Sequence, residues 1–149
     1  MRKAPQQERS QFMVSTILQA TARVFDRRGM ALTTRDVAEE AGVSVGSLYQ
    51  YFKNKEELLS ALVNQLGQAV ADIAMRDIAS RLDLDAREFY RQMLSAIVQL
   101  VADHPGYRAI ARHWHELRSV NAVHVSEQHL MEAARLYLLQ HHDEYQPKD

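Results

Sequence analysis

The stretch "TTRDVAEEAGVSVGSLYQYFKNKEEL", residues 33–58, restricts this part of the chain to short helices. Gly42 ends any helix that begins at Thr33 or Thr34, because glycine disfavours a helix interior and readily takes the left-handed position after a helix. Ser44 can cap the next helix. The spacing therefore predicts two short helices joined by a glycine-containing turn, which is a helix-turn-helix.

The rest of the chain is also expected to be helical. It has 149 residues but only five glycines and three prolines, and it lacks the alternating runs of β-branched residues that indicate strands. Ser10 can cap a first helix, and Gly29 can end it in the left-handed conformation. We predict an all-α protein with helices over about residues 10–28, 33–41, 44–52, 54–81, 85–103, 106–119 and 121–142.

Charge divides the chain into a basic first part and an acidic second part. Residues 1–55 contain nine Lys/Arg and five Asp/Glu, a balance of +4, whereas residues 56–149 contain nine and fourteen, a balance of −5. A basic end is typical of nucleic-acid contact, although so small an imbalance also arises by chance. We therefore expect a DNA-binding domain over 1–55, linked by the fourth helix to a helical body over 56–149.

Several classes of protein are excluded by composition or motif. The absence of cysteine excludes disulfides, thiol catalysis and cysteine zinc sites. The N-terminus lacks the apolar stretch of a secretory signal, and no run of eighteen apolar residues predicts a membrane helix. No nucleophile, phosphate-loop or zinc-protease motif is present, and histidines two residues apart point away from each other on a helix. We expect no enzyme activity, cofactor, metal or membrane contact, and a cytoplasmic location.

The second helix of a helix-turn-helix enters the major groove of DNA, and the residue types near it fall into two groups. Hydroxyl groups, ammonium groups and helix N-termini commonly bind phosphate, which selects Thr34, Ser44, Tyr49, Tyr51 and Lys55. Base edges and the groove floor suit side chains that can read them and small residues that allow close approach, which selects Arg35, Val45, Gly46, Ser47 and Gln50. The alternative is a helical pair with half-buried tyrosines and no DNA partner.

The same stretch resembles the N-terminal signature of the TetR/AcrR family of transcriptional regulators, over roughly residues 10–63. The matching positions are Thr33-Thr34, Val37-Ala38, Ala41-Gly42-Val43-Ser44, Gly46, Leu48-Tyr49, Tyr51-Phe52 and Lys55. The resemblance implies phosphate contacts by Thr34, Tyr49, Tyr51 and Lys55, and groove contacts by Arg35, Val45, Gly46, Ser47 and Gln50. Many members have histidine where this chain has Tyr51. The family is typically a homodimeric repressor that a small-molecule effector releases from a palindromic DNA operator.

Beyond residue 65 the signature ends, and the resemblance implies only that the body encloses an effector pocket. Such pockets are mostly apolar with a few polar groups, and His113 and Trp114 are the first residues to test. For most candidates the alternative is ordinary core packing. The candidates are Met93, Ile97, Tyr107, Ile110, His113, Trp114, Leu117, Leu130, Met131 and Tyr137.

The resemblance also implies a departure at the C-terminus, where family members continue with two long dimerisation helices. We expect the body to be incomplete there, so the chain is a shortened piece, dimerises in another way, or is a monomer. A monomer would lose the geometry of two DNA half-sites. The alternative function is a helical small-molecule-binding or protein-interaction module without DNA binding.

Overall fold

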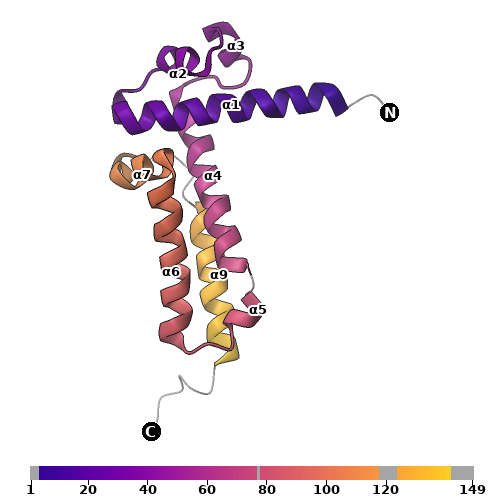
Figure 1. Ribbon diagram of the computed structural model, residues 1–149, viewed down its shortest axis with the longest axis vertical. Coiled ribbons are helices and arrows are strands. Elements are labelled where there is room, and N and C mark those ends of the chain that lie inside the picture. Colours follow the sequence, from indigo (N-terminus) through magenta and orange to yellow (C-terminus); the bar gives the residue numbers. More distant parts are fainter. Residues whose placement is uncertain (1–3, 77, 118–123, 142–149) are drawn as a thin grey trace.

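A computed structural model describes residues 4–76, 78–117 and 124–141, and within these ranges the regular structure is helical (Figure 1). This confirms the predicted all-α class. The elements are α1 (Ala4–Arg28), the 3-10 turn η1 (Gly29–Ala31), α2 (Thr34–Ala41), α3 (Val45–Tyr49), α4 (Lys55–Met75), α5 (Ile78–Arg81), α6 (Ala86–Asp103), α7 (Pro105–Arg112), α8 (Trp114–Leu117) and α9 (His124–Gln140).

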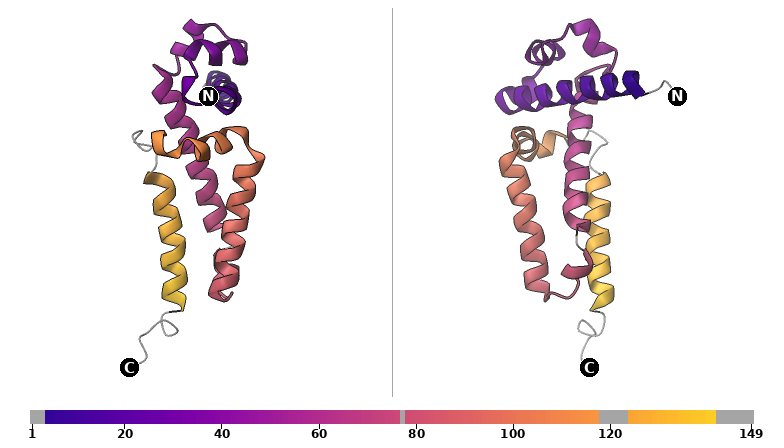
Figure 2. Two further views of the ribbon diagram at one scale, coloured as in Figure 1. Left: turned by 90° about the vertical axis from the view of Figure 1, so that its left-hand side faces the viewer. Right: turned by 45° about the vertical axis from the view of Figure 1, so that its right-hand side comes forward.

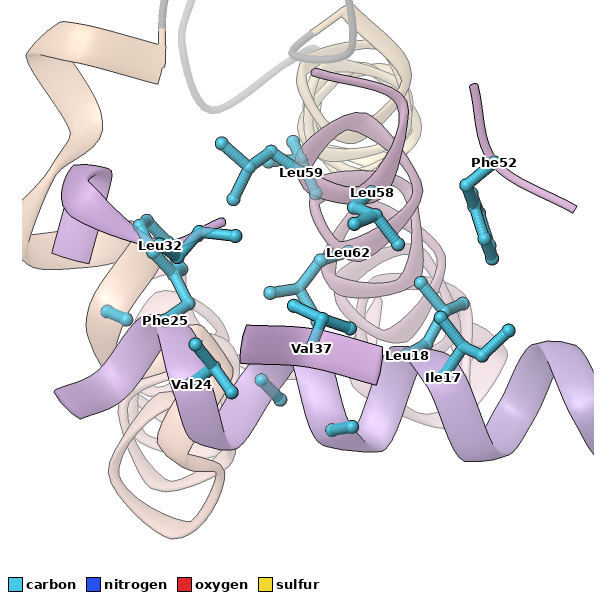
Figure 3. Packing of buried hydrophobic residues seen from close by; sticks show 14 of the residues in the cluster. Ile17, Leu18, Val24, Phe25, Leu32, Val37, Phe52, Leu58, Leu59 and Leu62 are labelled. Atoms are coloured by element: carbon cyan, nitrogen blue, oxygen red, sulfur yellow. The ribbon is translucent and has the colours of Figure 1, made fainter. Parts of the chain in front are cut away.

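The first three helices form what we call the head, residues 4–54. α1 is a long rod, and α2 and α3 lie across its upper side (Figure 1). Ile17, Val24 and Phe25 of α1 are fully buried, as is Val37 of α2. Figure 3 shows these side chains converging between α1 and α2, with leucines of α4 completing the cluster.

The remaining helices form what we call the body, residues 55–141. α4 descends from the head, and α9 packs along it (Figure 2). α6 runs beside α4, and α7 follows α6 and packs beneath α1. Two groups of buried residues follow from this arrangement. An upper cluster is shared with the head, and a lower cluster contains Ala74, Met93 and Ala133.

The upper cluster crosses the expected domain boundary at residue 55. It includes Leu48 and Phe52 from the head together with Leu58, Leu62 and Ile110 from the body. Burial of apolar surface therefore joins head and body directly, in addition to their connection through α4. A movement of α4 or α7 would therefore change how α1 packs on the upper cluster.

A polar junction reinforces this contact on the outside. Arg108 Nη2 of α7 lies 3.4 Å from a carboxylate oxygen of Asp26, and Arg112 Nη2 donates to the other carboxylate oxygen and, at 3.2 Å, to the Asp26 carbonyl. The His113 ring lies against Phe25, with ring centroids 5.5 Å apart. It also covers Gly29, where an added Cβ would lie 2.6 Å from Nε2.

Local signals explain most of the helix boundaries. Thr33 and Asp36 form a reciprocal capping box at α2, and Ser44, Asn54 and Asp85 each accept a backbone N–H at the start of α3, α4 and α6. Gly29 has φ of 56°, which confirms its predicted left-handed conformation, and Gly42 ends α2 as predicted, with φ of 69°.

Three predicted boundaries were wrong, and one predicted helix is interrupted. α1 begins at Ala4, before Ser10, and α3 ends at Tyr49 instead of continuing to Phe52. α4 ends at Met75, after which Arg76 has an extended backbone, and the helix predicted over 106–119 is divided at His113, whose φ of −106° and ψ of 22° are not helical. The ends predicted at residues 119, 121 and 142 lie outside the described residues.

By length and composition, α4 meets the usual test for a helix that could cross a membrane, which the search for an unbroken apolar run did not anticipate. Its apolar residues are used inside the protein instead. Leu58, Leu59 and Leu62 are 1 % exposed or less, and α4 contacts α1, α6, α7 and α9. This is the pattern of a central core helix.

Candidate nucleic-acid interface

The α2–α3 pair is fixed at both helix starts by its own side chains. The Thr33 hydroxyl accepts from the Asp36 N–H at 3.2 Å, and the Asp36 carboxylate accepts from the Thr33 N–H at 3.0 Å. In the next helix the Ser44 hydroxyl accepts from the Ser47 N–H at 3.0 Å. Each cap satisfies backbone donors that would otherwise be free. The start of each short helix is therefore fixed by its own cap.

Their apolar side chains turn inward and leave a polar face outside. Val37 and Leu48 are fully buried, and Phe52 is nearly so. Between them the backbone presents Arg35, Gly46 and Gln50 to solvent. The expectation that α3 holds an exposed face away from the core is consistent with this geometry.

Gly46 is the most informative position on this face. A Cβ added there would meet no atom closer than the Ser44 hydroxyl at 3.9 Å. Packing within the described protein therefore does not require glycine, although glycine costs a helix about 1 kcal/mol relative to alanine. What the missing side chain provides is free space outside α3, into which another molecule can approach the backbone.

Two hydroxyl groups on this face are already paired. Thr34, at the start of α2, places its Oγ1 3.1 Å from the Tyr49 OH at the end of α3. Tyr49 is 49 % exposed and Thr34 is half-buried. Because a hydroxyl can donate once and accept twice, both groups retain capacity for a further partner. The pair joins the two helices and presents its polar atoms at one place.

Ser44 and Ser47 form a second pair, with their hydroxyl oxygens 2.8 Å apart. The Ser44 hydroxyl is therefore engaged both by this bond and by the cap, and Ser47 is half-buried. Val45, also half-buried, packs against the upper cluster. These three residues form the start of α3, next to the exposed Gly46.

The last two phosphate candidates lie where the head joins α4. Lys55 is half-buried, and its Nζ donates to the carbonyl of Met30 at 3.0 Å. An ammonium group has three N–H donors, so two remain for another acceptor. Tyr51 is half-buried beside the N-terminal half of α1, where it lines a groove with Arg9 and Phe12.

Ion pairs remove several charges of the head from this face. Glu40 receives Arg23 and Arg27, each at 2.6 Å, and Arg28 lies 2.7 Å from Asp36. Hydrogen bonds, first from Arg27 and then from Arg23, lower the pKa of Glu40. The Thr33 hydroxyl is the main cause of the lowered pKa of Asp36. These carboxylates stay ionised and are neutralised by their partners.

Among the described residues of the head and its junction with α4, two basic side chains have no such acceptor. Arg23, Arg27 and Arg28 pair with carboxylates, as does Lys53 at 3.9 Å from Glu57, and Lys55 bonds a carbonyl. Arg35, predicted from the sequence, and Arg9, which the sequence analysis did not select, are exposed and unpaired. Only the charge asymmetry of residues 1–55 pointed toward Arg9.

Seven of the ten effector-pocket candidates divide between the two ends of the body. Tyr107, Ile110 and Leu117 are buried in the upper cluster, with Trp114 packed against it, and Met93 is buried in the lower cluster with Ile97 beside it. Tyr137 is fully buried over Phe89, and its hydroxyl donates to the Leu84 carbonyl at 3.1 Å.

The other three candidates have different surroundings. His113 lies against the head, and its Nδ1 is 2.9 Å from Glu116 Oε2. Met131 is 69 % exposed, and the side chain of Leu130 lies outside the described residues. Within the described ranges, no group of three His, Cys, Asp or Glu side chains is arranged to hold a metal ion.

Comparison with known proteins gives the same assignment for the head. Residues 17–62 match the family model described as bacterial regulatory proteins, tetR family. The chain is 38 % identical over 98 residues to the probable HTH-type transcriptional regulator ArpR of Pseudomonas putida, covering 64 % of this chain and 46 % of that protein. It is 37 % identical over 98 residues to the HTH-type transcriptional regulator TtgR of the same species, with the same coverage. The chain thus spans about half the length of these curated relatives.

Solved structures extend the similarity into the body. A gamma-butyrolactone receptor (ArpA-like protein) superposes with a TM-score of 0.73 at 26 % identity, covering 95 % of this chain and 72 % of the other. A TetR-family regulator from Streptomyces coelicolor gives a TM-score of 0.67 at 27 % identity, covering 85 % and 68 %. The order of helices in head and body is therefore one that solved proteins share.

Proposed function

Residues 17–62 make this chain a member of the TetR family of bacterial transcriptional regulators, and on that premise we propose that it binds double-stranded DNA through α2 and α3. The observation that carries the proposal is the open space at Gly46, on an exposed face whose neighbours are polar. A helix of this kind enters the major groove, and a glycine lets its backbone come close to the bases.

The contacts divide into those that position the duplex and those that read it. Thr34 and Tyr49 offer their paired hydroxyls to one phosphate, Lys55 offers its remaining N–H groups, and Ser44 and Tyr51 lie at the two ends of α3. Such contacts carry no sequence information. Arg35 and Gln50 are exposed and can reach base edges, while Val45, Gly46 and Ser47 form the surface that faces the groove floor.

The body supplies the regulation in this proposal. A small-molecule effector that binds between α4, α6 and α9 would favour one setting of α4 and α7. Because α7 contacts α1 through Asp26 and the upper cluster, that setting changes the presentation of the head. By linkage, DNA and effector must then weaken or strengthen each other's binding equally. We propose that the chain is a repressor and that it acts as a homodimer on a palindromic operator. We also propose that it acts in the bacterial cytoplasm.

Selection of genomic DNA fragments by the purified protein tests the proposal and supplies the target sequence. Its affinity should then fall steeply with salt, because phosphate contacts release counterions. A salt series without a slope, or a selection that enriches no fragment, would contradict DNA binding. A light-scattering mass of the protein alone and on DNA decides between monomer and dimer.

Point variants separate the two kinds of contact. Tyr49→Phe and Lys55→Ala should weaken binding to all sequences alike, whereas Arg35→Ala should relax the preference at one base position by about 1–3 kcal/mol. Arg87→Ala is the matched control, since it removes the same charge from an exposed position on α6 of the body. If all four variants behave alike, the assignment of roles is wrong.

A further inference from the structure

The N-terminal half of α1 carries a surface that the proposed function does not yet use. α1 begins at Ala4 and projects beyond α3 and α4, as two views show (Figures 1 and 2). Four residues of this projecting part and one residue that follows α3 line a groove. They are Glu8, Arg9, Phe12, Met13 and Tyr51, and we call this feature the Arg9–Tyr51 groove.

The groove is continuous with the candidate DNA interface. Tyr51 follows α3 directly and belongs both to the phosphate candidates and to the groove wall. A duplex that lies on α3 and meets Tyr51 therefore passes the mouth of this groove. The groove residues therefore extend the candidate interface from Tyr51, just after α3, to the N-terminal half of α1.

The groove combines a free cation with an apolar floor. Arg9 is exposed and, within the described part of the chain, contacts no carboxylate or carbonyl, unlike the head arginines at positions 23, 27 and 28. Phe12 is 73 % exposed, the most exposed aromatic side chain among the large hydrophobic residues described, and it lies beside Met13 and Tyr51. A sugar-phosphate backbone presents an anion next to a less polar sugar, and this combination matches the groove.

We propose that the Arg9–Tyr51 groove binds the sugar-phosphate backbone of the same DNA duplex that α3 enters. Arg9 donates to a phosphate oxygen, the Tyr51 hydroxyl donates to the same or the adjacent phosphate, and a deoxyribose packs on Phe12. Glu8 also lines the groove, and its carboxylate repels the strand. The inference rests on the proposed DNA binding, and it adds a contact made by the first helix instead of the helix-turn-helix.

The test uses the full chain and a DNA fragment obtained by genomic selection, with affinity measured by fluorescence anisotropy across a salt series. Arg9→Gln should weaken binding about tenfold, as expected for loss of one charge-assisted hydrogen bond. It should also make the slope of log affinity against log salt shallower by about 1, because one fewer counterion is released. Every sequence should be affected alike, because the contact reads no base.

Two further variants make the result specific. Glu8→Gln should strengthen binding and leave the preferred sequence unchanged, and Phe12→Ala should weaken binding without changing the salt slope. Arg87→Gln on α6 is the charge-matched control and should have no effect. The three changed residues lie on the exposed part of α1, outside the buried core, so circular dichroism should show unaltered folding.

The outcomes separate this inference from the proposal on which it rests. If the wild-type chain binds DNA and Gln50→Ala weakens that binding, while Arg9→Gln leaves both affinity and salt slope unchanged, the groove proposal is overturned and α3 binding stands. If the unmodified chain binds no DNA at any salt concentration, the proposed function itself fails, and this inference fails with it.

Discussion

The head and the body are both helical, but they achieve order in different ways. In the head, α2 and α3 are very short, and each begins at a side chain that caps it. The large apolar residues exposed there are Phe12 and Tyr49, which lie on the proposed DNA side. In the body, α6 and α9 are long, and they expose Leu94, Val98, Met131, Leu138 and Leu139.

This contrast teaches where each region obtains its stability. Short helices are unstable alone, so the head depends on caps and on a core that closes around Val37 and Leu48. The body's helices are longer, and they pack on one side while exposing apolar residues on the other. The head should therefore respond sharply to single changes, and the outer face of the body should tolerate them. Four experiments test this comparison.

The largest effect is expected when the same substitution is made in both regions. Leu48→Ala removes a fully buried side chain from the middle of α3 and should lower the free energy of unfolding by about 2–5 kcal/mol. Leu94→Ala on α6 removes a side chain that is 56 % exposed and should change it by less than about 0.5 kcal/mol. Urea unfolding measures both. Equal losses would show that Leu94 is covered in solution and that the comparison is wrong.

The next experiment concerns the junction between the two regions. Gly29→Ala places a side chain where φ is 56° and where its Cβ would lie 2.6 Å from the His113 ring. The left-handed conformation costs about 1–2 kcal/mol for a residue other than glycine, and displacement of His113 adds to this. In a His113→Ala background only the backbone cost should remain. A double-mutant cycle by urea unfolding measures the difference, and strict additivity would show that His113 does not press on the head.

The same contrast explains what could be predicted from the sequence. The cap at Ser44, the helix starts near Asn54 and Asp85 and the stop at Gly42 depend on signals within one helical turn, so residue type and spacing were sufficient to place them. The choice between Thr33 and Thr34 as the cap of α2 stayed open in the sequence, and the structure assigns it to Thr33. The division of α3 into inward and outward faces followed from the same local periodicity. This is why the exposed positions of Gly46 and Gln50 could be anticipated.

What could not be predicted depends on contacts between distant segments. The break at His113 coincides with its contact on Phe25 and Gly29, which are more than eighty residues earlier. Asp26 was not selected at all, because nothing near it in the sequence indicates that Arg108 and Arg112 will approach it. Arg9 was missed for a related reason, since a charged residue becomes informative only once the partners of its neighbours are known.

A smaller effect is expected at the two neighbouring threonines of α2. Thr33→Ala removes the capping box and should lower the free energy of unfolding by about 1 kcal/mol. Thr34→Ala removes only a surface bond to Tyr49 and should lower the free energy of unfolding by less than about 0.5 kcal/mol. Relative to this small loss of stability, Thr34→Ala should weaken DNA binding more than Thr33→Ala does. Thermal unfolding and anisotropy on each variant give the two numbers. A larger loss of stability for Thr34→Ala than for Thr33→Ala would show that Thr34, and not Thr33, is the structural cap.

The smallest effect is expected at the corner between α6 and α7. The His104 ring stacks on Tyr107 with centroids 3.9 Å apart, and its buried Nδ1 has no hydrogen-bond partner among the described residues. Burial, with a smaller contribution from Arg108, lowers the pKa of His104 below its usual 6.5. His104 is therefore protonated less readily in the folded chain than in the unfolded chain.

The sign of the pH dependence follows from linkage. The contribution of neutral His104 to stability is complete above pH 6.5 and is lost as the pH falls from 6.5 through the lowered folded-state pKa. His104→Gln should therefore reduce the fall in thermal stability between about pH 7.5 and 5.5, and His115→Gln, at an exposed histidine on α8, is the matched control. If both variants keep the wild-type pH dependence, the ring is hydrated in solution. The α6–α7 corner would then belong with the tolerant outer surface of the body and not with the closely packed junction under the head.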